Sequence, residues 1–445
     1  MQQLVSLVSH VSKNALVRQN RIQKFVGKQL CTVVATLLLL SGCTSADFVR
    51  LLATPIAPVA SQANATVPPP LSGNRLLVLG TDGNLFTVNP DGTAPFSLTT
   101  DASRTRSYAQ ASWSPSGAKI GWTMVEQQGA KLTSTLLTSR VDGRERTATA
   151  TRFAPFYLYW SPDDSQLAYL SNWLTDEGQT IALHTVDLTT DSAAPTLIET
   201  GQPLYFSWAP DSKQMLTHVA NERAALVTVA SGEMTVLSEA ATNFAAPQWS
   251  TSGDRLLFVT AIDRIPQLVL TDTAGDNAQL VTNLSRDDAI SFSLNPQGSQ
   301  LAYVETSQQI GFSAFGPLFV YTLNKGQFSQ LSDGPVLAFA WSPNGEALFF
   351  LTAEAEGNRV WLRVNLWDGT KVHSYERFAP SPILLREYLP FADQYMQSVR
   401  FWSPDSSAVV YAGIGEDGRR GVWVQPLTGD AQLVTEGLFA TWSPK

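Results

Sequence analysis

At residues 113–122 the sequence reads WSPSGAKIGW, and variants of this phrase return along the rest of the chain. The residue that opens each copy is a tryptophan with one exception: Trp113, Trp160, Trp208, Trp249, Leu294, Trp341, Trp402 and Trp442. The successive spacings are 47, 48, 41, 45, 47, 61 and 40 residues. Repeats of about 40–50 residues are typical of β-propellers, in which each repeat forms one four-stranded blade.

Each copy has the pattern of two strands joined by a tight turn. A short apolar segment ends at the tryptophan, and Ser-Pro-Asp/Asn-Gly then supplies turn residues with suitable backbone preferences. An alternating apolar strand follows, as at residues 255–259, RLLFV. A third strand comes 10–20 residues later, and a more polar fourth strand closes the unit, as at residues 278–282 and 431–435, which both read AQLVT. The pattern predicts an all-β fold of four-stranded blades.

The two ends of this region complement each other. Residues 75–79 read as a second strand, with a third and a fourth strand after it, whereas residues 438–442 read as a first strand that has no successor. Pairing the two would complete one blade and would remove the open sheet edges that invite aggregation. We therefore predict an eight-bladed β-propeller over residues 74–445, whose ring is closed when the C-terminal strand joins the N-terminal blade.

The repeat resembles the TolB-type, WD-like propeller repeat of bacterial periplasmic proteins, over essentially all of residues 74–445. The resemblance implies the fold but selects no activity, because this repeat occurs both in binding proteins and beside peptidase domains. The chain departs from the pattern at Leu294, which replaces a tryptophan, and in a number of repeats above the six of TolB.

The N-terminal segment has the features of an export signal. A basic region precedes the apolar run at residues 30–40, which is too short for the roughly 20 residues that a membrane-spanning helix needs. Residues 1–42 are therefore predicted to be a signal peptide. Leu40-Ser41-Gly42-Cys43 resembles the bacterial lipobox, which implies that Cys43 carries the lipid.

A linker is expected between the anchor and the propeller. Residues 43–73 are rich in proline and alanine, which favours a semi-extended tether. Thr44 follows the cysteine in place of the aspartate that resembles an inner-membrane retention signal. We expect an exported lipoprotein that is attached to the membrane through Cys43, at the periplasmic face of the outer membrane or at the cell surface.

The charge of the remaining chain is acidic. Residues 1–42 hold five of the 30 basic residues and none of the 38 acidic ones. Such an excess of carboxylates repels phosphate backbones, so we expect no nucleic-acid partner. Both cysteines, Cys31 and Cys43, precede the predicted domain, which therefore has no disulfide.

No recognisable catalytic motif stands out. His184, His218 and His373 lack the spacing of a zinc site, and no Gly-x-Ser-x-Gly elbow or phosphate-binding loop occurs. We expect no enzymatic activity, no metal and no cofactor. One alternative stays open, namely a hydrolase or lyase that acts on glycans or lactones with carboxylates at the channel mouth, since spatial pairing of acids is invisible in a sequence.

Recognition is expected in the loops that lead into the first strands, which in propellers face the mouth of the central channel. The candidates for partner binding are Arg106, Tyr108, Arg152, Phe153, Tyr205, Asn243, Phe244 and Asp288. The repeated tryptophans are expected to pack between blades. The 61-residue spacing reflects an insertion at residues 379–397, for which we predict a short helix capping one face. The leading hypothesis is a monomeric, non-enzymatic lipoprotein that binds or scaffolds a protein or cell-envelope partner.

Overall fold

The computed structural model describes residues 73–190, 194–238, 243–307, 309–310, 313–357 and 359–445. The predicted signal peptide, the lipidation site Cys43 and all of the predicted linker except Gly73 lie outside the described residues.

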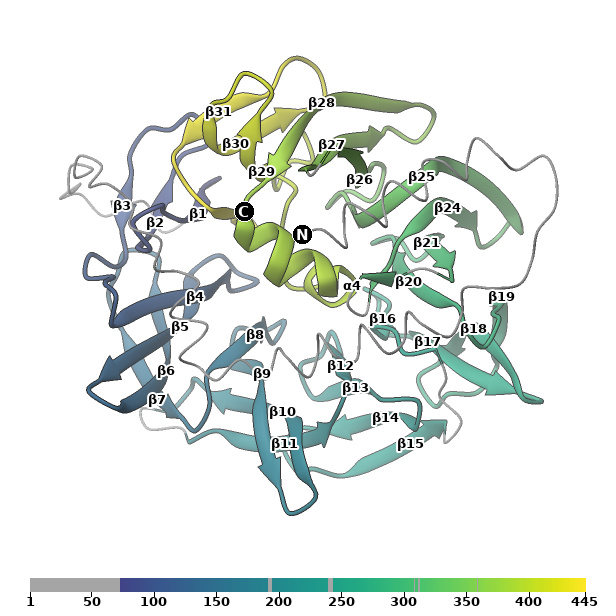
Figure 1. Ribbon diagram of the computed structural model, residues 1–445. Coiled ribbons are helices and arrows are strands. Elements are labelled where there is room, and N and C mark those ends of the chain that lie inside the picture. Colours follow the sequence, from purple (N-terminus) through teal and green to yellow (C-terminus); the bar gives the residue numbers. More distant parts are fainter. Residues whose placement is uncertain (1–72, 191–193, 239–242, 308, 311–312, 358) are drawn as a thin grey trace.

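The described chain is built from antiparallel sheets that stand around a central axis, as in a propeller (Figure 1). Five of the sheets in the described part have four strands. From the centre outward they are β32 (Phe439–Trp442), β1 (Leu76–Leu79), β2 (Leu85–Val88) and β3 (Phe96–Ser97); β4 (Arg106–Trp113), β5 (Lys119–Gln128), β6 (Lys131–Arg140) and β7 (Thr147–Thr151); β8 (Pro155–Trp160), β9 (Gln166–Thr175), β10 (Gly178–Asp187) and β11 (Thr196–Gly201); β12 (Leu204–Trp208), β13 (Gln214–Val219), β14 (Arg223–Thr228) and β15 (Met234–Ser238); and β16 (Gln248–Trp249), β17 (Arg255–Ile262), β18 (Ile265–Asp272) and β19 (Gln279–Asn283).

The rest of the ring departs from the expectation of separate blades, because its strands form one ten-stranded sheet. In order, they are β20 (Ala289–Leu294), β21 (Gln300–Thr306), β24 (Gly316–Thr322), β25 (Gln327–Trp341), β26 (Leu348–Glu356), β27 (Arg359–Trp367), β28 (Val372–Pro380), β29 (Ala408–Gly415), β30 (Arg420–Pro426) and β31 (Gln432–Thr435). A small pair, β22 (Gln309–Ile310) and β23 (Ser313–Ala314), lies between β21 and β24. The sheet is continuous because β25 and β28 each run on from the last strand of one unit into the first of the next.

The two ends of the domain meet as an antiparallel pair. β1 pairs with β32 over four residues, from Leu76 opposite Trp442 to Leu79 opposite Phe439. Ser443 extends the contact, since its hydroxyl accepts a hydrogen bond from the backbone N–H of Arg75 at 3.0 Å.

The repeated tryptophans link neighbouring units, as the sequence analysis expected. Five of their indoles donate to the residue just before the equivalent position in the preceding unit: Trp113 to Thr441 O, Trp160 to Ser112 Oγ, Trp208 to Tyr159 O, Trp341 to Ser293 O and Trp402 to Ala340 O, at 2.9–3.3 Å. Where Leu294 replaces the tryptophan, Gln248 bridges the units instead, with bonds to Phe292 O and Leu294 N.

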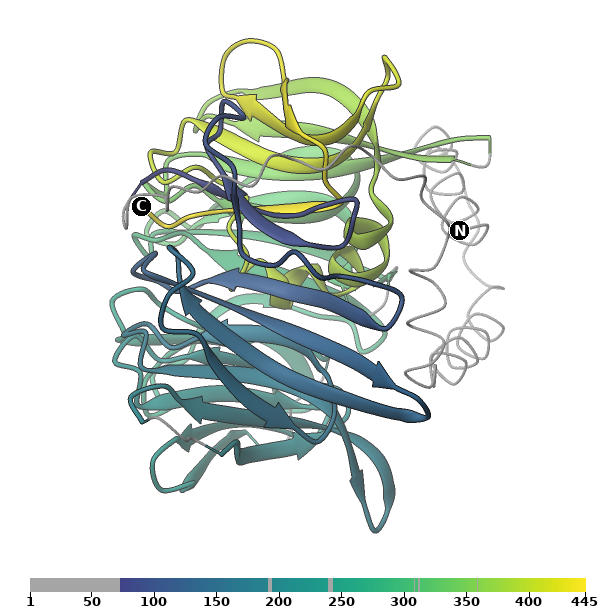
Figure 2. The ribbon, with the colours of Figure 1, turned by 90° about the vertical axis from the view of Figure 1, so that its left-hand side faces the viewer.

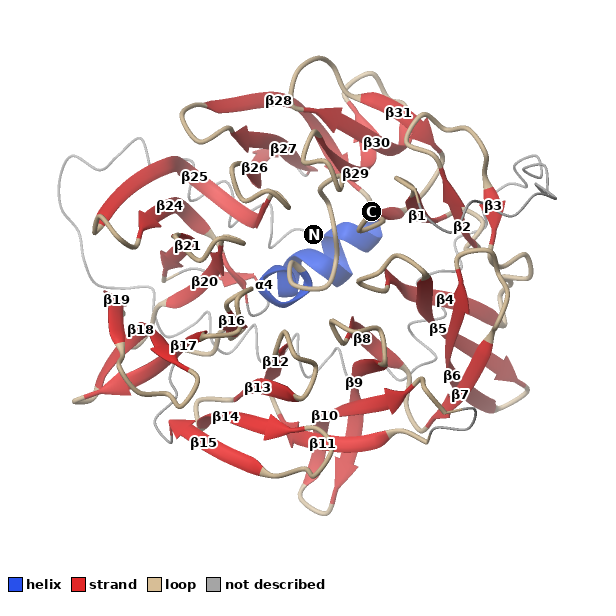
Figure 3. Ribbon diagram, turned by 180° about the vertical axis from the view of Figure 1, so that it is seen from behind, coloured by secondary structure: helices blue, strands red, loops and turns tan. Residues whose placement is uncertain are grey.

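The insertion is helical but does not cap an outer face, so that part of the prediction was wrong. It comprises a π-helical turn η1 (Leu384–Tyr388), a 3-10 turn η2 (Leu389–Phe391) and a short α-helix α4 (Ala392–Tyr395). These turns cross the middle of the ring when it is viewed along its axis (Figure 1, Figure 3). The side view shows them within the thickness of the ring (Figure 2). We call residues 381–399 the insertion below.

Candidate functional site

The insertion occupies the centre of the ring through hydrogen bonds to several inner strands. Gln394, which is buried, accepts from Phe206 N at 3.0 Å and donates to Phe206 O at 2.8 Å, so its amide pairs with the β12 backbone as a strand would. The same amide donates to the hydroxyl of Tyr157 on β8 at 2.9 Å. Tyr395 donates to Phe156 O at 2.6 Å and to Gln110 on β4 at 3.1 Å.

Aromatic packing connects the insertion to a further inner strand, β32. The ring of Tyr388 stacks on Phe439 of β32 with centroids 3.9 Å apart, and it also lies 4.4 Å from the ring of Tyr395. The insertion therefore touches inner strands on opposite sides of the axis. The chain itself fills the place where an open propeller channel would lie.

A small cavity remains beside the insertion. Apolar side chains such as Leu77, Leu85 and Ile383 line it together with Tyr108 and Glu387, and its volume is about 30 Å³. One water molecule needs roughly 10–15 Å³ by this measure. The cavity therefore has room for water but not for a small-molecule substrate.

Two carboxyl groups of the insertion have raised pKa values. Burial raises the pKa of Glu387 to about 7, and this side chain makes no hydrogen bond within the described residues. Burial also raises the pKa of Asp393, to about 6, against the opposing effect of hydrogen bonds that include one from Ser313 Oγ at 2.9 Å. Both groups are thus poised to change charge near neutral pH.

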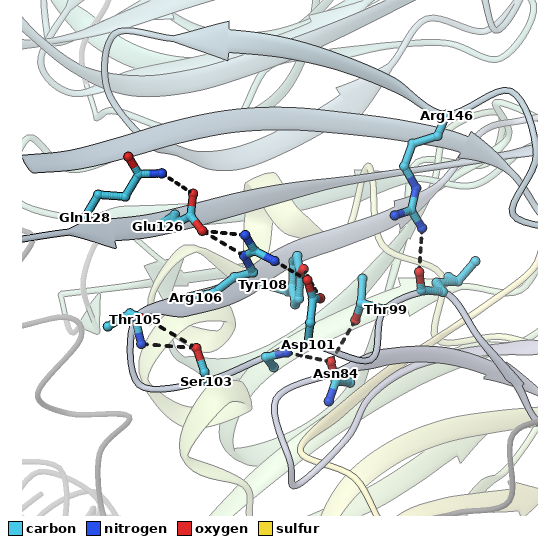
Figure 4. Close-up of polar contacts among 12 residues, drawn as sticks. Asn84, Thr99, Asp101, Ser103, Thr105, Arg106, Tyr108, Glu126, Gln128 and Arg146 are labelled. Carbon is cyan, nitrogen blue, oxygen red and sulfur yellow. Dashed lines mark hydrogen bonds and ion pairs between the residues drawn. The ribbon is translucent and has the colours of Figure 1, made fainter.

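The predicted residues Arg106 and Tyr108 lie in β4 and form one polar cluster with neighbouring acids (Figure 4). The Arg106 guanidinium bridges Asp101 and Glu126. The Tyr108 hydroxyl donates to Asp101 Oδ1 at 2.6 Å, and this bond is the largest cause of the lowered pKa of that carboxyl. Gln128 donates to the second oxygen of Glu126 at 2.9 Å. Asp101 and Glu126 therefore balance the positive charge of Arg106 within the chain.

Arg152 and Phe153 precede β8 and contact an aromatic side chain of β9. The Arg152 guanidinium carbon lies 5.4 Å from the ring centroid of Phe153 and 4.8 Å from that of Trp173. The two rings meet edge to face at 6.1 Å. Arg152 is exposed and forms no ion pair with the described residues.

Of the other four candidates, Tyr205 and Asn243 are buried, whereas Phe244 and Asp288 are half-buried. Burial removes the first two from the surface that a partner could contact, contrary to the expectation. The rings of Tyr205 and Phe244 lie 4.5 Å apart. Asn243 donates to Asp288 O at 2.6 Å, which ties the loops before β16 and β20 together. Burial raises the pKa of Tyr205, and so does the nearby Asp393 carboxyl, which is also its hydrogen-bond partner. Tyr205 thus contacts the insertion through Asp393.

His218 belongs to the same interior. It pairs with Tyr205 across β12 and β13, its Nδ1 lies 2.9 Å from Ala245 O, and burial lowers its pKa to about 4. It is therefore neutral at physiological pH. Within the described residues, no group of three or more His, Cys, Asp or Glu side chains is placed to hold a metal ion.

The sequence analysis missed the residues that complete these clusters. Trp173 lies on β9, the second strand after Arg152, and Glu126 lies on β5 opposite Arg106. Asp101 lies in the loop before β4. The pairing of strands in long hairpins was the signal that could have predicted Trp173 and Glu126. Gln394 and Tyr395 lie in the insertion, whose length was noticed but whose position was misjudged. None of the helices in the described part of the chain has the length and apolar composition needed to cross a membrane.

Several solved structures are similar to this one. A crystal structure of the eukaryotic initiation factor matches over 84% of this chain and 99% of its own, with a TM-score of 0.51 and 13% sequence identity. TolB from Acinetobacter baumannii matches over 81% and 79%, with a TM-score of 0.37 and 16% identity. An oligogalacturonate lyase in complex with manganese matches over 63% and 82%, with a TM-score of 0.44 and 13% identity. No protein-family model and no curated protein sequence matches the chain. At such identities the likeness concerns the fold alone.

Proposed function

We propose that this chain is a non-enzymatic, monomeric envelope lipoprotein that binds a protein partner through the loop side of an eight-bladed, closed propeller. We define the loop side as the side where the last strand of one unit leads into the first strand of the next. The observation that carries the proposal is the insertion: it fills the centre of the ring, so the surface left for recognition is the outer loops. Loops on a rigid scaffold are where binding residues concentrate.

The eight-bladed closed ring is supported by the contacts of the last strand. β32 pairs on one edge with β1, and Thr441 of the same strand accepts the indole hydrogen bond of Trp113 in the following unit. The C-terminal strand thereby has the same neighbours as the first strands of internal repeats. Counting the repeats of the phrase with this composite unit yields eight.

The alternative is an enzyme that acts on glycans or lactones at the channel mouth. A ligand site for such a molecule is expected to enclose about 300–1,000 Å³. The cavity beside Glu387, at the centre of the ring, measures about 30 Å³, which disfavours an active site at that place. A more open pocket of about 330 Å³ lies away from the insertion, between Arg377 and Glu416 at the ends of β26, β27 and β29.

The exit point of the chain supports attachment from the side opposite the loops. The carbonyl of Gly73 accepts a hydrogen bond from Ser443 Oγ at 3.0 Å, and Pro444 packs beside the turn at Gly117. This is the side of the Ser-Pro turns, whereas Arg106 and Arg152 lie at the opposite ends of their strands or beyond. A lipid on Cys43 would thus leave the loop side free.

Two experiments test the proposal. Metabolic labelling with a radioactive fatty acid should label the full-length chain, and Cys43→Ser should abolish the label. Affinity purification of the detergent-solubilised protein, followed by mass spectrometry, should recover a protein partner in stoichiometric amount. Recovery of glycans with no protein partner would instead support the enzymatic alternative.

A further inference from the structure

Two arginines in comparable positions on the loop side have opposite surroundings. Arg106 contacts two carboxylates, Asp101 and Glu126, which neutralise its charge. Arg152 is exposed, and none of its N–H groups makes a hydrogen bond or an ion pair with the described residues. Asp176 and Glu177, the acids of the β9–β10 turn near Trp173, form no ion pair with Arg152 either. Arg152 therefore presents an uncompensated positive charge on an acidic protein.

Aromatic rings hold this charge in place. The guanidinium of Arg152 rests against Phe153 and Trp173, and each contact lies within the roughly 6 Å range of a cation–π interaction. Neither contact uses an N–H group in a hydrogen bond. The side chain is thus held in place while its donors stay available to a partner.

The rings are themselves anchored in the blade. Trp173 meets His184 edge to face with centroids 5.0 Å apart, and His184 stacks on Tyr169, also at 5.0 Å. Tyr169 and His184 are buried, and burial lowers the pKa of His184, so no second positive charge arises below Arg152 at neutral pH. A rigid platform of this kind lowers the entropy lost when a partner binds.

Together these side chains form a surface near the end of the β9–β10 hairpin, which projects from the rim of the ring (Figure 1). We call Arg152, Phe153 and Trp173 the Arg152 patch. Leu174, which follows Trp173 in the strand, points to the opposite face of the hairpin and is not part of it. The patch combines a planar cation with two aromatic rings, which is the composition of binding hot spots.

We propose that the Arg152 patch binds an acidic segment of a protein partner, with an Asp or Glu carboxylate on the Arg152 guanidinium and an adjacent apolar side chain on the rings of Phe153 and Trp173. This inference rests on the proposed function, because it names the partner chemistry of a protein-binding propeller. A carboxylate matches the paired donors of a guanidinium geometrically. A polyanion such as nucleic acid needs several Lys or Arg contacts, whereas the Arg152 patch holds one cation.

The test selects 12-residue peptides from a random displayed library against the purified chain. Enriched peptides should carry Asp or Glu next to an apolar residue. A synthetic copy of the best peptide should bind Arg152→Gln at least about tenfold more weakly than the parent, as loss of a hot-spot contact predicts. Arg152→Lys should recover only part of that affinity, because an ammonium cannot pair with a carboxylate through a planar fork.

Matched controls make the result specific. Arg286→Gln removes an exposed arginine from the corresponding loop before β20 and should leave the affinity unchanged. Replacing the acidic residue of the peptide by its amide should weaken binding to the parent but not to Arg152→Gln. Peptides that bind Arg152→Gln as tightly as the parent would overturn the inference and leave the proposed function standing. A library that enriches no peptide would overturn both.

Discussion

The Ser-Pro turns and the insertion both hold the units of this ring together, but they do so on different scales. Each turn reaches only its neighbour: Asp164 accepts hydrogen bonds from Ser114 and Ser116 one repeat earlier, and Ser212 accepts one from Asp163 N. The insertion reaches across the axis, from β32 to β4, β8 and β12. A repeated contact can lose one copy at little cost, whereas a single central contact has no substitute.

The largest effect is therefore expected at Gln394. Gln394→Leu keeps the volume of the side chain but leaves the N–H and the C=O of Phe206 without these partners in a buried site. At about 1–3 kcal/mol for each orphaned group, the free energy of unfolding should fall by about 4 kcal/mol. Urea denaturation measures it.

The control for this variant lies in the same segment. Gln397 is only partly buried and donates one hydrogen bond, to Pro247 O at 3.1 Å. Gln397→Leu should cost about 1 kcal/mol. Equal losses in the two variants would contradict a special position of Gln394 in the centre of the ring.

The next largest effect on stability is expected at an acid of the insertion, and it depends on pH. Folding raises the pKa of Glu387 from 4.5 to about 7, so its contribution to stability is present below about pH 4.5 and is lost as the pH rises through about 7. Glu387→Gln removes this loss. At pH 8 the variant should be more stable than the parent by about 3 kcal/mol, and at pH 4 the two should be equal.

Thermal unfolding between pH 4 and pH 8 checks this expectation. Asp393 still titrates in the variant, and its pKa is also raised, so some decrease in stability with rising pH should remain. A variant that is less stable than the parent at pH 8 would show that the Glu387 carboxylate has a stabilising partner.

The tryptophans of the repeat allow a comparison within one residue type. Trp341 donates to Ser293 O at 2.9 Å, whereas the buried indole nitrogen of Trp249 has no partner in the described residues. Trp341→Phe should therefore destabilise the protein by about 1.5 kcal/mol more than Trp249→Phe does. Guanidinium denaturation of both variants measures the difference. Equal losses would mean that packing alone, and not the bond between units, explains the tryptophans.

The repeat could be predicted from the sequence because its signals are local. The Ser-Pro turns, the alternating strands and the pairing of Leu76 with Trp442 all follow from residues close in sequence or from the count of strands. The position of the insertion could not, because Gln394 meets Phe206 across 188 residues and no periodicity records that contact. For the same reason Tyr205 and Asn243 were expected at the mouth of the channel, although both are buried.

The smallest effect is expected at a single Ser-Pro turn. Asp164 occupies a position with φ of 60° that is glycine in other copies, such as Gly117 with φ of 76°. Asp164→Ala loses the bonds to Ser114 and Ser116 and keeps the left-handed backbone, whereas Asp164→Gly loses the same bonds but removes the steric cost of that conformation. The alanine variant should be less stable than the glycine variant by about 1 kcal/mol. Differential scanning calorimetry of the two proteins would reveal the difference as separate melting temperatures, and a glycine variant that melts below the alanine variant would mean that side-chain contacts, not the backbone, dominate at this turn.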